Sequence, residues 1–190
     1  KELGASKVGL VAPYLAYMRQ DKRFNLGEAV SSIYFAKVLS SWIDWLVTVD
    51  PHLHRRSSLD EIYSVPSATV HAAPLVSEWI RGAVSAPLLI GPDSESEQWV
   101  AAVAADAGAP FVVLEKTRRG DRDVEVTVPE VDKWHDRTPV LVDDIISTAR
   151  TMIETVGHVR AAGLQAPVCI GIHAVFADNA YVELKQAGAG

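Results

Sequence analysis

Two adjacent aspartates, followed by a run of hydroxyl side chains, are the strongest chemical signal in this sequence of 190 residues. Asp143 and Asp144 follow the apolar run Val140–Val142, and the hydroxyl-rich stretch Ser147–Thr151 leads into a helical pattern. Free amides and the dipole at a helix start favour a phosphate there, while carboxylates accept bonds from sugar hydroxyls or hold hydrated Mg²⁺. A capped helix after a strand is the alternative. The paired acids favour a site for a phosphorylated ribose.

Acidic residues also end two other apolar runs, at Asp50 and at Asp93. The carboxyl ends of parallel strands meet at one edge of a sheet, where loops converge on ligands. Aspartate is also a common helix cap and turn residue, so a single strand end carries little weight. Three such ends, one of them doubled, favour convergence around one metal or polyhydroxyl ligand.

Short apolar runs and helical stripes alternate along the chain, as is typical of buried strands and the helices between them. The predicted strands are Val8–Tyr17, Trp45–Val49, Ala68–Ala73, Pro87–Ile90, Phe111–Leu114, Val140–Val142 and Val168–Ile172. The helical stripes are Phe35, Val38, Leu39 and Trp42; Trp99, Val100, Val103 and Ala107 before Gly108; and Met152, Val156 and Val159 before Gly163.

This alternation predicts an α/β fold with parallel sheets flanked by helices. A break near Val84–Pro87 divides the chain into two such units, residues 1–85 and residues 86–190. The chain begins without methionine and stops just after a helical segment, so we expect both ends to be cut inside a longer fold.

Composition excludes several classes of protein. A net charge of −6 and a pI near 5.5 argue against a general nucleic-acid binder. No apolar run reaches the length of a membrane span, and no signal-peptide pattern opens the chain. The single cysteine, Cys169, excludes a disulfide framework and fits a reducing, cytoplasmic compartment as a buried small hydrophobe. His173 lies in an apolar run and is interpreted as a core histidine.

The Asp143–Thr151 segment resembles the phosphoribosyl-diphosphate (PRPP) motif of the type I phosphoribosyltransferase fold. Upstream, Pro13–Asp21 resembles the ATP-binding stretch of ribose-phosphate diphosphokinases, the PRPP synthetases, and Asp50-Pro-His52 resembles their metal-binding Asp-x-His. Pro92-Asp93 is similar to their Pro-Asp, and Lys116-Thr-Arg118 to the Lys-x-Arg of their catalytic loop. These motifs occur in the family's order over essentially the whole chain, so the resemblance implies two phosphoribosyltransferase-like units.

The resemblance implies Mg²⁺-dependent transfer of the diphosphoryl group of ATP to O1 of ribose 5-phosphate. The residues that it implies for ATP are Arg19, Gln20, Asp21 and His52, with His52 and Asp93 for the metal. For ribose phosphate it implies Asp93, Asp143, Asp144, Ser147, Thr148, Ala149, Arg150 and Thr151. Lys116 and Arg118 would close over the transferring group and neutralise its charge. It also implies a homo-oligomer.

Simpler interpretations stand beside these roles. Arg19 and Asp21 could form a surface ion pair, and His52 and His54 with Arg55 and Arg56 could form a solvated basic turn. The charged stretch from Lys116 to residue 123 predicts a mobile exposed loop, which a catalytic lid would also be.

The sequence departs from the family pattern at several positions. Arg150 stands where the motif usually has glycine, Ser147 replaces a frequent acid, and Ser94–Glu97 adds two carboxylates near the phosphate site. Leu53–Arg56 replaces a glutamine-containing run. Two alternatives therefore stay open: a catalytically weakened regulatory homologue that binds nucleotide or sugar phosphate, and a PRPP-using phosphoribosyltransferase.

Overall fold

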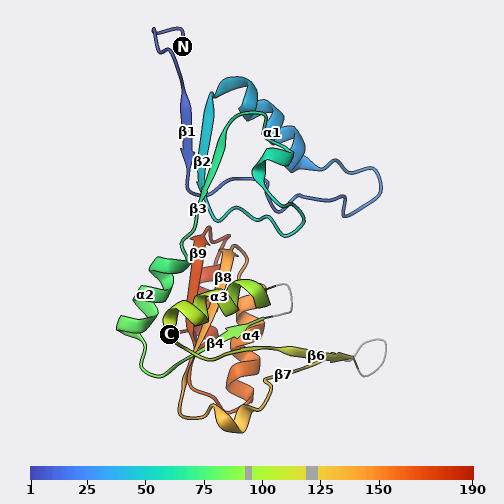
Figure 1. The fold of residues 1–190 in the computed structure, drawn as a ribbon. Helices are drawn as coiled ribbons and strands as arrows, with labels where there is room; N and C mark the ends of the chain where they lie inside the picture. Colours follow the sequence, from blue (N-terminus) through green and yellow to red (C-terminus); the bar gives the residue numbers. More distant parts are fainter. Residues whose placement is uncertain (93–95, 119–123) are drawn as a thin grey trace. The chain divides into compact units, whose positions relative to one another are not determined.

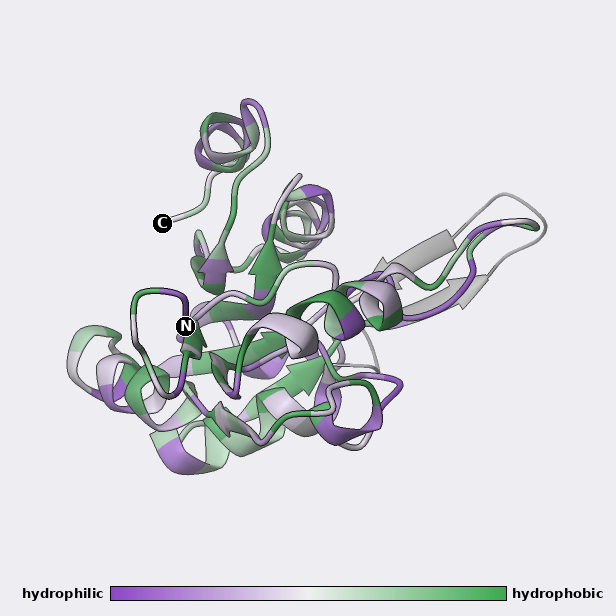
Figure 2. Ribbon diagram, turned by 90° about the horizontal axis from the view of Figure 1, so that it is seen from above, coloured by the Kyte–Doolittle hydropathy of each residue, from purple (hydrophilic) through white to green (hydrophobic). Residues whose placement is uncertain are grey.

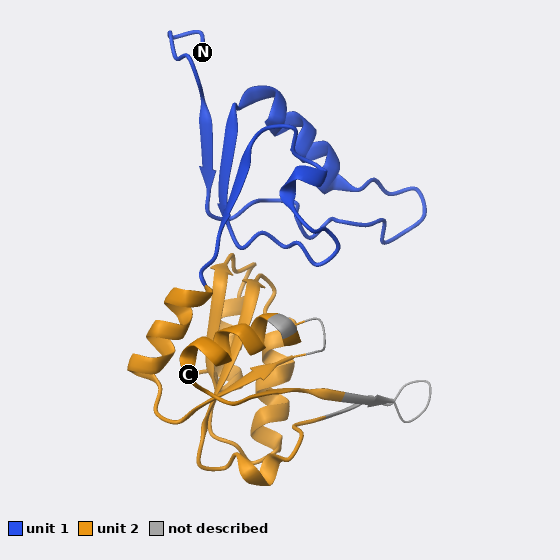
Figure 3. Cartoon of the chain, viewed as in Figure 1, with its two compact units in different colours: residues 1–72 blue, residues 73–190 orange. Residues whose placement is uncertain are grey.

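A computed structural model describes residues 1–92, 96–118 and 124–190, which form two compact units, Lys1–Ala72 and Ala73–Gly190 (Figure 3). The sequence predicts a division at residue 85, whereas the observed division precedes helix α2, Ala73–Ala83. Ile80 and Val84 bury their side chains against Val100 and Val103 of α3, Glu97–Ala107. Because burial of apolar surface is the main stabilising term, α2 belongs to the second unit.

The N-terminal unit is built on a parallel sheet in the order β1-β2-β3 (Figure 1). Its strands are β1, Gly9–Ala12; β2, Trp45–Val49; and β3, Ser67–Val70, and a short 3₁₀ helix, η1, covers Leu59–Glu61. The predicted run Val8–Tyr17 is a shorter strand, because Pro13 has no N–H to donate to the ladder. The carbonyl of Pro13 instead accepts from the amide of Val49 at 3.1 Å.

Helix α1, Ser31–Trp42, packs on this sheet with a face that differs from the predicted one. Phe35 and Leu39 join the core as expected, and the fully buried Ala36 lies between them. Val38 and Trp42 are exposed by 57% and 75%. The helix is therefore rotated toward Ala36, since its small side chain allows the helix to approach the strands closely.

The C-terminal unit has a four-stranded parallel sheet in the order β5-β4-β8-β9, between two layers of helices (Figure 1). Helices α2 and α3 share one core with one face of the sheet, and α4 and α5 share the core on the other face. The bounds are β4, Pro87–Gly91; β5, Phe111–Val113; β8, Thr138–Ile146; β9, Val168–Ala174; α4, Arg150–Ala161; and α5, Ala180–Ala187. The predicted α/β architecture with parallel sheets is confirmed.

Strand β8 is longer than the predicted Val140–Val142 and includes both aspartates of the motif. Its pairing with β9 continues past Asp143, which lies opposite Gly171, to Ile146, which lies opposite Ala174. Asp143 and Asp144 therefore lie within a strand and not in the loop after it. Ile145 and Ile146 are buried, and their burial draws this segment into the sheet.

The charged stretch near Lys116 is also more ordered than predicted. Strands β6, Glu115–Arg118, and β7, Val124–Thr127, form an antiparallel pair, followed by the 3₁₀ helix η2, Val131–Lys133. Backbone pairing satisfies the amides whatever the side chains carry, so a charged sequence can still form a strand. The prediction of a loop is wrong for Lys116–Arg118, and residues 119–123 lie outside the described part of the chain.

Residue hydropathy follows this layering. The strands are mainly hydrophobic, whereas the helices carry both hydrophobic and hydrophilic residues (Figure 2). His173 in β9 is 7% exposed, which confirms that it is a core residue. Among the described residues, none of the helices combines the length and the apolar character that a transmembrane span requires.

Gly171 allows β9 to lie close beside the buried end of β8. A Cβ atom at this position would lie 2.5 Å from Cδ1 and 2.7 Å from Cγ1 of Ile146. Such contacts are shorter than packed atoms tolerate, so an added Cβ would force the Ile146 side chain to move.

We expect Gly171→Ala to destabilise the fold by about 1–3 kcal/mol, the usual cost of overpacking. Urea unfolding would measure the change, with Gly157→Ala as the control, because Gly157 lies in α4 with no atom within 4 Å of the added Cβ. The control should gain about 0.5–1 kcal/mol from helix propensity. Adding Ile146→Val, which removes Cδ1, should recover part of the loss. Equal stability of Gly171→Ala and the unmodified protein would contradict the close packing.

Candidate functional site

A small hollow lies beside the end of β8 in the C-terminal unit. Its polar lining comes from Asp143, Thr151 and Thr155. The remaining lining residues are Pro92, Leu141, Val142 and Met152. The hollow thus joins a carboxylate and two threonines at the carboxyl edge of the parallel sheet, where ligands of such sheets bind.

The two aspartates of the motif do not play the same part. Successive side chains of a strand point to opposite faces of the sheet, so Asp143 and Asp144 diverge. Asp143 lines the hollow, whereas Asp144 is not part of its lining. Each makes an interaction of its own and is partly buried. Of the two aspartates, Asp143 alone therefore contributes to the lining of the hollow.

The start of α4 gives this region a positive electrostatic character. Arg150 is the first helical residue, and the first turn of α4 contains no acidic residue. Within the described residues, no side chain caps this end of the helix. The first amides and the positive end of the dipole therefore stay available for an anion.

Ala149 forms the turn between β8 and α4 in a left-handed conformation, with φ of 57°. A non-glycine residue pays a steric cost in this region, and such strain gathers at ligand sites. Its methyl group is buried in the core with an exposed fraction of 6%, which offsets part of that cost. Ser147, whose carbonyl accepts from the amide of Ala177 at 3.1 Å, fixes the loop to the chain after β9.

Three further residues of the predicted phosphate cradle lie at the surface. Thr148, Arg150 and Thr151 are exposed. Arg150 has a helical backbone and needs no glycine-like conformation, so it replaces glycine without disturbing the turn.

Sequence analysis missed Thr155, which is buried at 4% exposure and lines the hollow. The Thr155 hydroxyl donates to the carbonyl of Thr151, one turn earlier, at 2.7 Å. The i, i+4 spacing of these two threonines on one helix was the signal that could have found it.

In the N-terminal unit, the predicted nucleotide residues follow a tight turn after β1. Tyr17 has φ of 64°, and the amide of Gln20 donates to the carbonyl of Tyr17 at 2.9 Å. Met18, only 1% exposed, anchors the turn in the core, whereas Arg19 and Gln20 are exposed. The turn thus presents the Arg19 and Gln20 side chains to solvent on a fixed backbone.

Asp21 is not the partner of Arg19 that one interpretation predicts. Its carboxylate forms a salt bridge with Arg55, with 3.3 Å between Oδ2 and Nη1. The Asp21 side chain is only 2% exposed, so the pair is not a surface ion pair of small effect. In the predicted basic turn, His54 and Arg55 are exposed, whereas Arg56 is partly buried and donates to the Ser32 hydroxyl.

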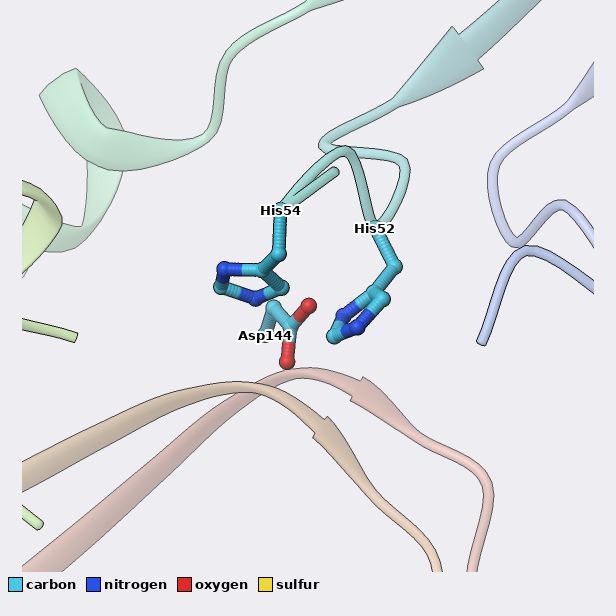
Figure 4. A group of neighbouring side chains, drawn as sticks. All are labelled: His52, His54 and Asp144. Atoms are coloured by element: carbon cyan, nitrogen blue, oxygen red, sulfur yellow. The ribbon is translucent and has the colours of Figure 1, made fainter. Parts of the chain in front are cut away.

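His52 and His54 lie in the loop that follows β2, with ring centroids 4.1 Å apart in an edge-to-face contact. Figure 4 shows both imidazoles projecting from this loop; Asp144, which is also drawn, belongs to β8 of the other unit. Asp50, which begins the same loop, accepts at 2.8 Å from the amide of Ala72 and pairs with His71 Nδ1 at 2.8 Å. Asp50 therefore ties the end of β3 to the end of β2, as a turn residue would.

Three predicted residues are not described in full. Asp93 lies outside the described residues, and for Lys116 and Arg118 only the backbone, in β6, is described. Their proposed roles stay predictions. So does the convergence of Asp50, Asp93 and Asp143, since Asp50 and Asp143 belong to different units.

Burial raises the pKa of two groups that the predicted chemistry does not use. The pKa of the Tyr63 hydroxyl and that of the Cys169 thiol are both raised to about 12. Lys185 lowers the latter slightly, against the larger effect of burial. Cys169 is therefore a protonated packing residue and not a nucleophile.

Comparison with known proteins gives consistent matches. A family model described as "Phosphoribosyl transferase domain" matches residues 58–189. The chain is 35% identical to a ribose-phosphate pyrophosphokinase of Methanopyrus kandleri over 99% of this chain and 64% of that protein. It is 36% identical to ribose-phosphate pyrophosphokinase 2 of Archaeoglobus fulgidus over 94% of this chain and 63% of that protein. The predicted relationship is confirmed, although the chain spans less than two thirds of either relative.

A crystal structure is similar as well. The phosphoribosylpyrophosphate synthetase from Mycobacterium smegmatis matches with a TM-score of 0.79 and 25% identity. The match covers 97% of this chain and 60% of that one.

We expect the Cys169 thiol to resist alkylation in the native protein at pH 8, because burial holds it protonated. Labelling with iodoacetamide, followed by intact-mass analysis, would measure this, and the unfolded protein serves as the control. Since Cys169 is the only cysteine, the label reports one site. The folded pKa of Cys169 lies above its unfolded value, so the contribution of this thiol to stability should be constant below pH 9 and fall as the pH rises toward 12. Rapid labelling of the native protein would contradict the burial.

Proposed function

The chain belongs to the phosphoribosyl transferase domain family, and on this premise we propose that its native protein is a ribose-phosphate diphosphokinase. The proposed reaction uses ATP and ribose 5-phosphate and gives PRPP and AMP. The anomeric O1 attacks the β-phosphorus, the bond from the β-phosphorus to the oxygen of AMP breaks, and the O1 proton passes to solvent. The observation that carries this proposal is the similarity to pyrophosphokinases along nearly the entire chain.

The hollow in the C-terminal unit supports a ribose 5-phosphate site. The amides at the start of α4 and the hydroxyls of Thr148 and Thr151 are donors for the 5-phosphate. Asp143 is an acceptor for ribose hydroxyls, and Arg150 adds positive charge beside the phosphate. Holding the sugar in this way would fix O1 for attack, which is a large part of catalysis in phosphoryl transfer.

The N-terminal unit supports an ATP site at the Tyr17–Gln20 turn. Arg19 and Gln20 project into solvent from an anchored backbone, so they can contact a nucleotide without reordering the chain. We place the triphosphate of ATP near His52, and we assign Lys116 and Arg118 to the developing charge on the transferring group. These assignments follow the order of motifs in the sequence.

Mg²⁺ fits the residues on the ribose side, because carboxylate oxygens are its preferred protein ligands. The Asp143 carboxylate would supply such an oxygen. We propose that Asp93, phosphate oxygens and waters supply further ligands. His52 and His54 offer nitrogen, so we assign His52 to orienting the hydrated ion. When bound, Mg²⁺ would neutralise phosphate charge during the transfer.

Production of AMP and PRPP is the first prediction of this proposal. The full-length native protein with ATP, Mg²⁺ and ribose 5-phosphate should form both products in equal amounts, measured by chromatography. Lys116→Ala should reduce turnover by about 10²–10³-fold, as loss of a charge-stabilising group does. Retained ATP binding without product would instead support the regulatory homologue. A reaction that consumes PRPP and a base would support the phosphoribosyltransferase.

The unequal positions of the two motif aspartates give a second prediction. Asp143→Asn should weaken ribose 5-phosphate binding by about 10–100-fold, the effect of losing a hydrogen bond to a charged group. Isothermal titration would measure the affinity. Asp136→Asn is the matched control, because it makes the same charge change in an exposed residue near the opposite end of β8. Equal affinities of Asp143→Asn and the control would remove Asp143 from the sugar site.

A further inference from the structure

Two arginines join the loop after β2 to the segment after β1 within the N-terminal unit. Arg55 pairs with Asp21, and Arg56 donates from Nη2 to the Ser32 hydroxyl at 3.0 Å. The Ser32 hydroxyl in turn donates to the carbonyl of Gln20 at 2.9 Å. These contacts, which we call the arginine clasp, end on the two residues that follow Arg19.

The first half of the clasp is asymmetric in burial. The Asp21 side chain is 2% exposed, whereas the Arg55 side chain is 40% exposed. A carboxylate removed from water needs a compensating cation, while a partly solvated arginine does not depend on its partner to the same degree. Loss of Arg55 should therefore cost more than loss of Asp21, because it would leave a buried charge that the segment can relieve by moving.

The second half of the clasp has a defined direction of hydrogen bonding. A guanidinium can only donate, so Arg56 requires the Ser32 oxygen to accept, which directs the Ser32 proton to the Gln20 carbonyl. The backbone amide of Ser32 donates to the same carbonyl at 3.3 Å. Hydrogen bonds in such a chain strengthen one another. The Gln20 carbonyl is thus held by two donors from the start of α1.

Arg56 carries a cost that a purely structural contact would avoid. Its Nη1 is buried, and it has no hydrogen-bond partner within residues 1–92, 96–118 and 124–190. A buried donor without a partner is unfavourable, and an apolar side chain of similar length would remove that penalty. Proteins tolerate such violations of a stability rule at functional or strained sites.

We propose that Arg55 and Arg56 are positioning residues that lock the Arg19–Asp21 segment to the loop carrying His52. The inference rests on the proposed function in that this segment binds nucleotide. His52 precedes Arg55 by three residues, so the clasp makes the two predicted nucleotide-contacting segments one rigid surface. These arginines stand where the sequence departs from the family's usual run after the Asp-x-His motif. The clasp is therefore a local solution of this chain for preordering its nucleotide site.

Methionine variants separate positioning from folding. Arg56→Met keeps the length of the side chain and removes the buried unpaired donor, so we expect the Tm to change by no more than about 2–4 °C, which for a chain of this size is about 1 kcal/mol. Hydrogen–deuterium exchange without nucleotide should nevertheless become about tenfold faster for residues 17–22, because the Gln20 turn loosens. Lys37→Met, an exposed change on α1, is the matched control and should leave that exchange unchanged.

Arg55→Met and Arg56→Met should each weaken binding of Mg²⁺-ATP, measured by isothermal titration, by about tenfold. Binding of ribose 5-phosphate should stay unchanged. Arg55→Lys should retain more affinity than Arg55→Met, because an ammonium can still pair with Asp21. The losses of ATP affinity caused by Ser32→Ala and Arg56→Met should not be additive, since both substitutions break the same chain of hydrogen bonds.

Unchanged exchange in residues 17–22 of both methionine variants would overturn the clasp, whatever their activity. Faster exchange with unchanged ATP affinity would overturn its role in positioning. Failure of the unmodified protein to bind ATP would overturn the proposed function together with that role, while the exchange experiment would still show whether the arginines hold the segment.

Discussion

The parallel pairing of β8 between β4 and β9 is the constraint on which the C-terminal unit depends. Both faces of a central parallel strand must be buried, and β8 has apolar residues toward each helical layer. The pairing continues past the aspartates because Gly171 leaves room for Ile146. As a result, the strand ends where α4 can begin after a three-residue turn, and the hollow forms between them.

That arrangement is the basis on which we propose a phosphate site in an acidic protein. The net charge is −6, yet the start of α4 combines uncapped amides with Arg150 and no acid in its first turn. Affinity for a small anion depends on this local field and not on the overall charge. Ala149 accepts a left-handed backbone to make the turn, and its buried methyl group compensates in part.

The N-terminal unit differs from the C-terminal unit, because its predicted nucleotide residues lie in loops and not at a helix start. Loops hold side chains in place only when other contacts fix them. Met18 anchors one end of the Tyr17–Gln20 turn in the core, and Asp50 ties the ends of two strands. Arg55 and Arg56 join the segment after β1 to the loop after β2. From the sequence alone, these arginines could equally belong to a solvated basic turn.

The sequence by itself determined the α/β class, the family and all seven of the predicted strands in outline, because hydrophobic periodicity and motif order are local properties. Only the tertiary structure decided that Asp143 and Asp144 diverge, that Val38 and Trp42 face solvent, that α2 belongs to the second unit, and that Asp21 pairs with Arg55. Each of these depends on strand register, helix rotation or contacts between distant residues. The physical reason is that burial selects among several arrangements of nearly equal local energy, and burial is fixed only when the whole unit packs.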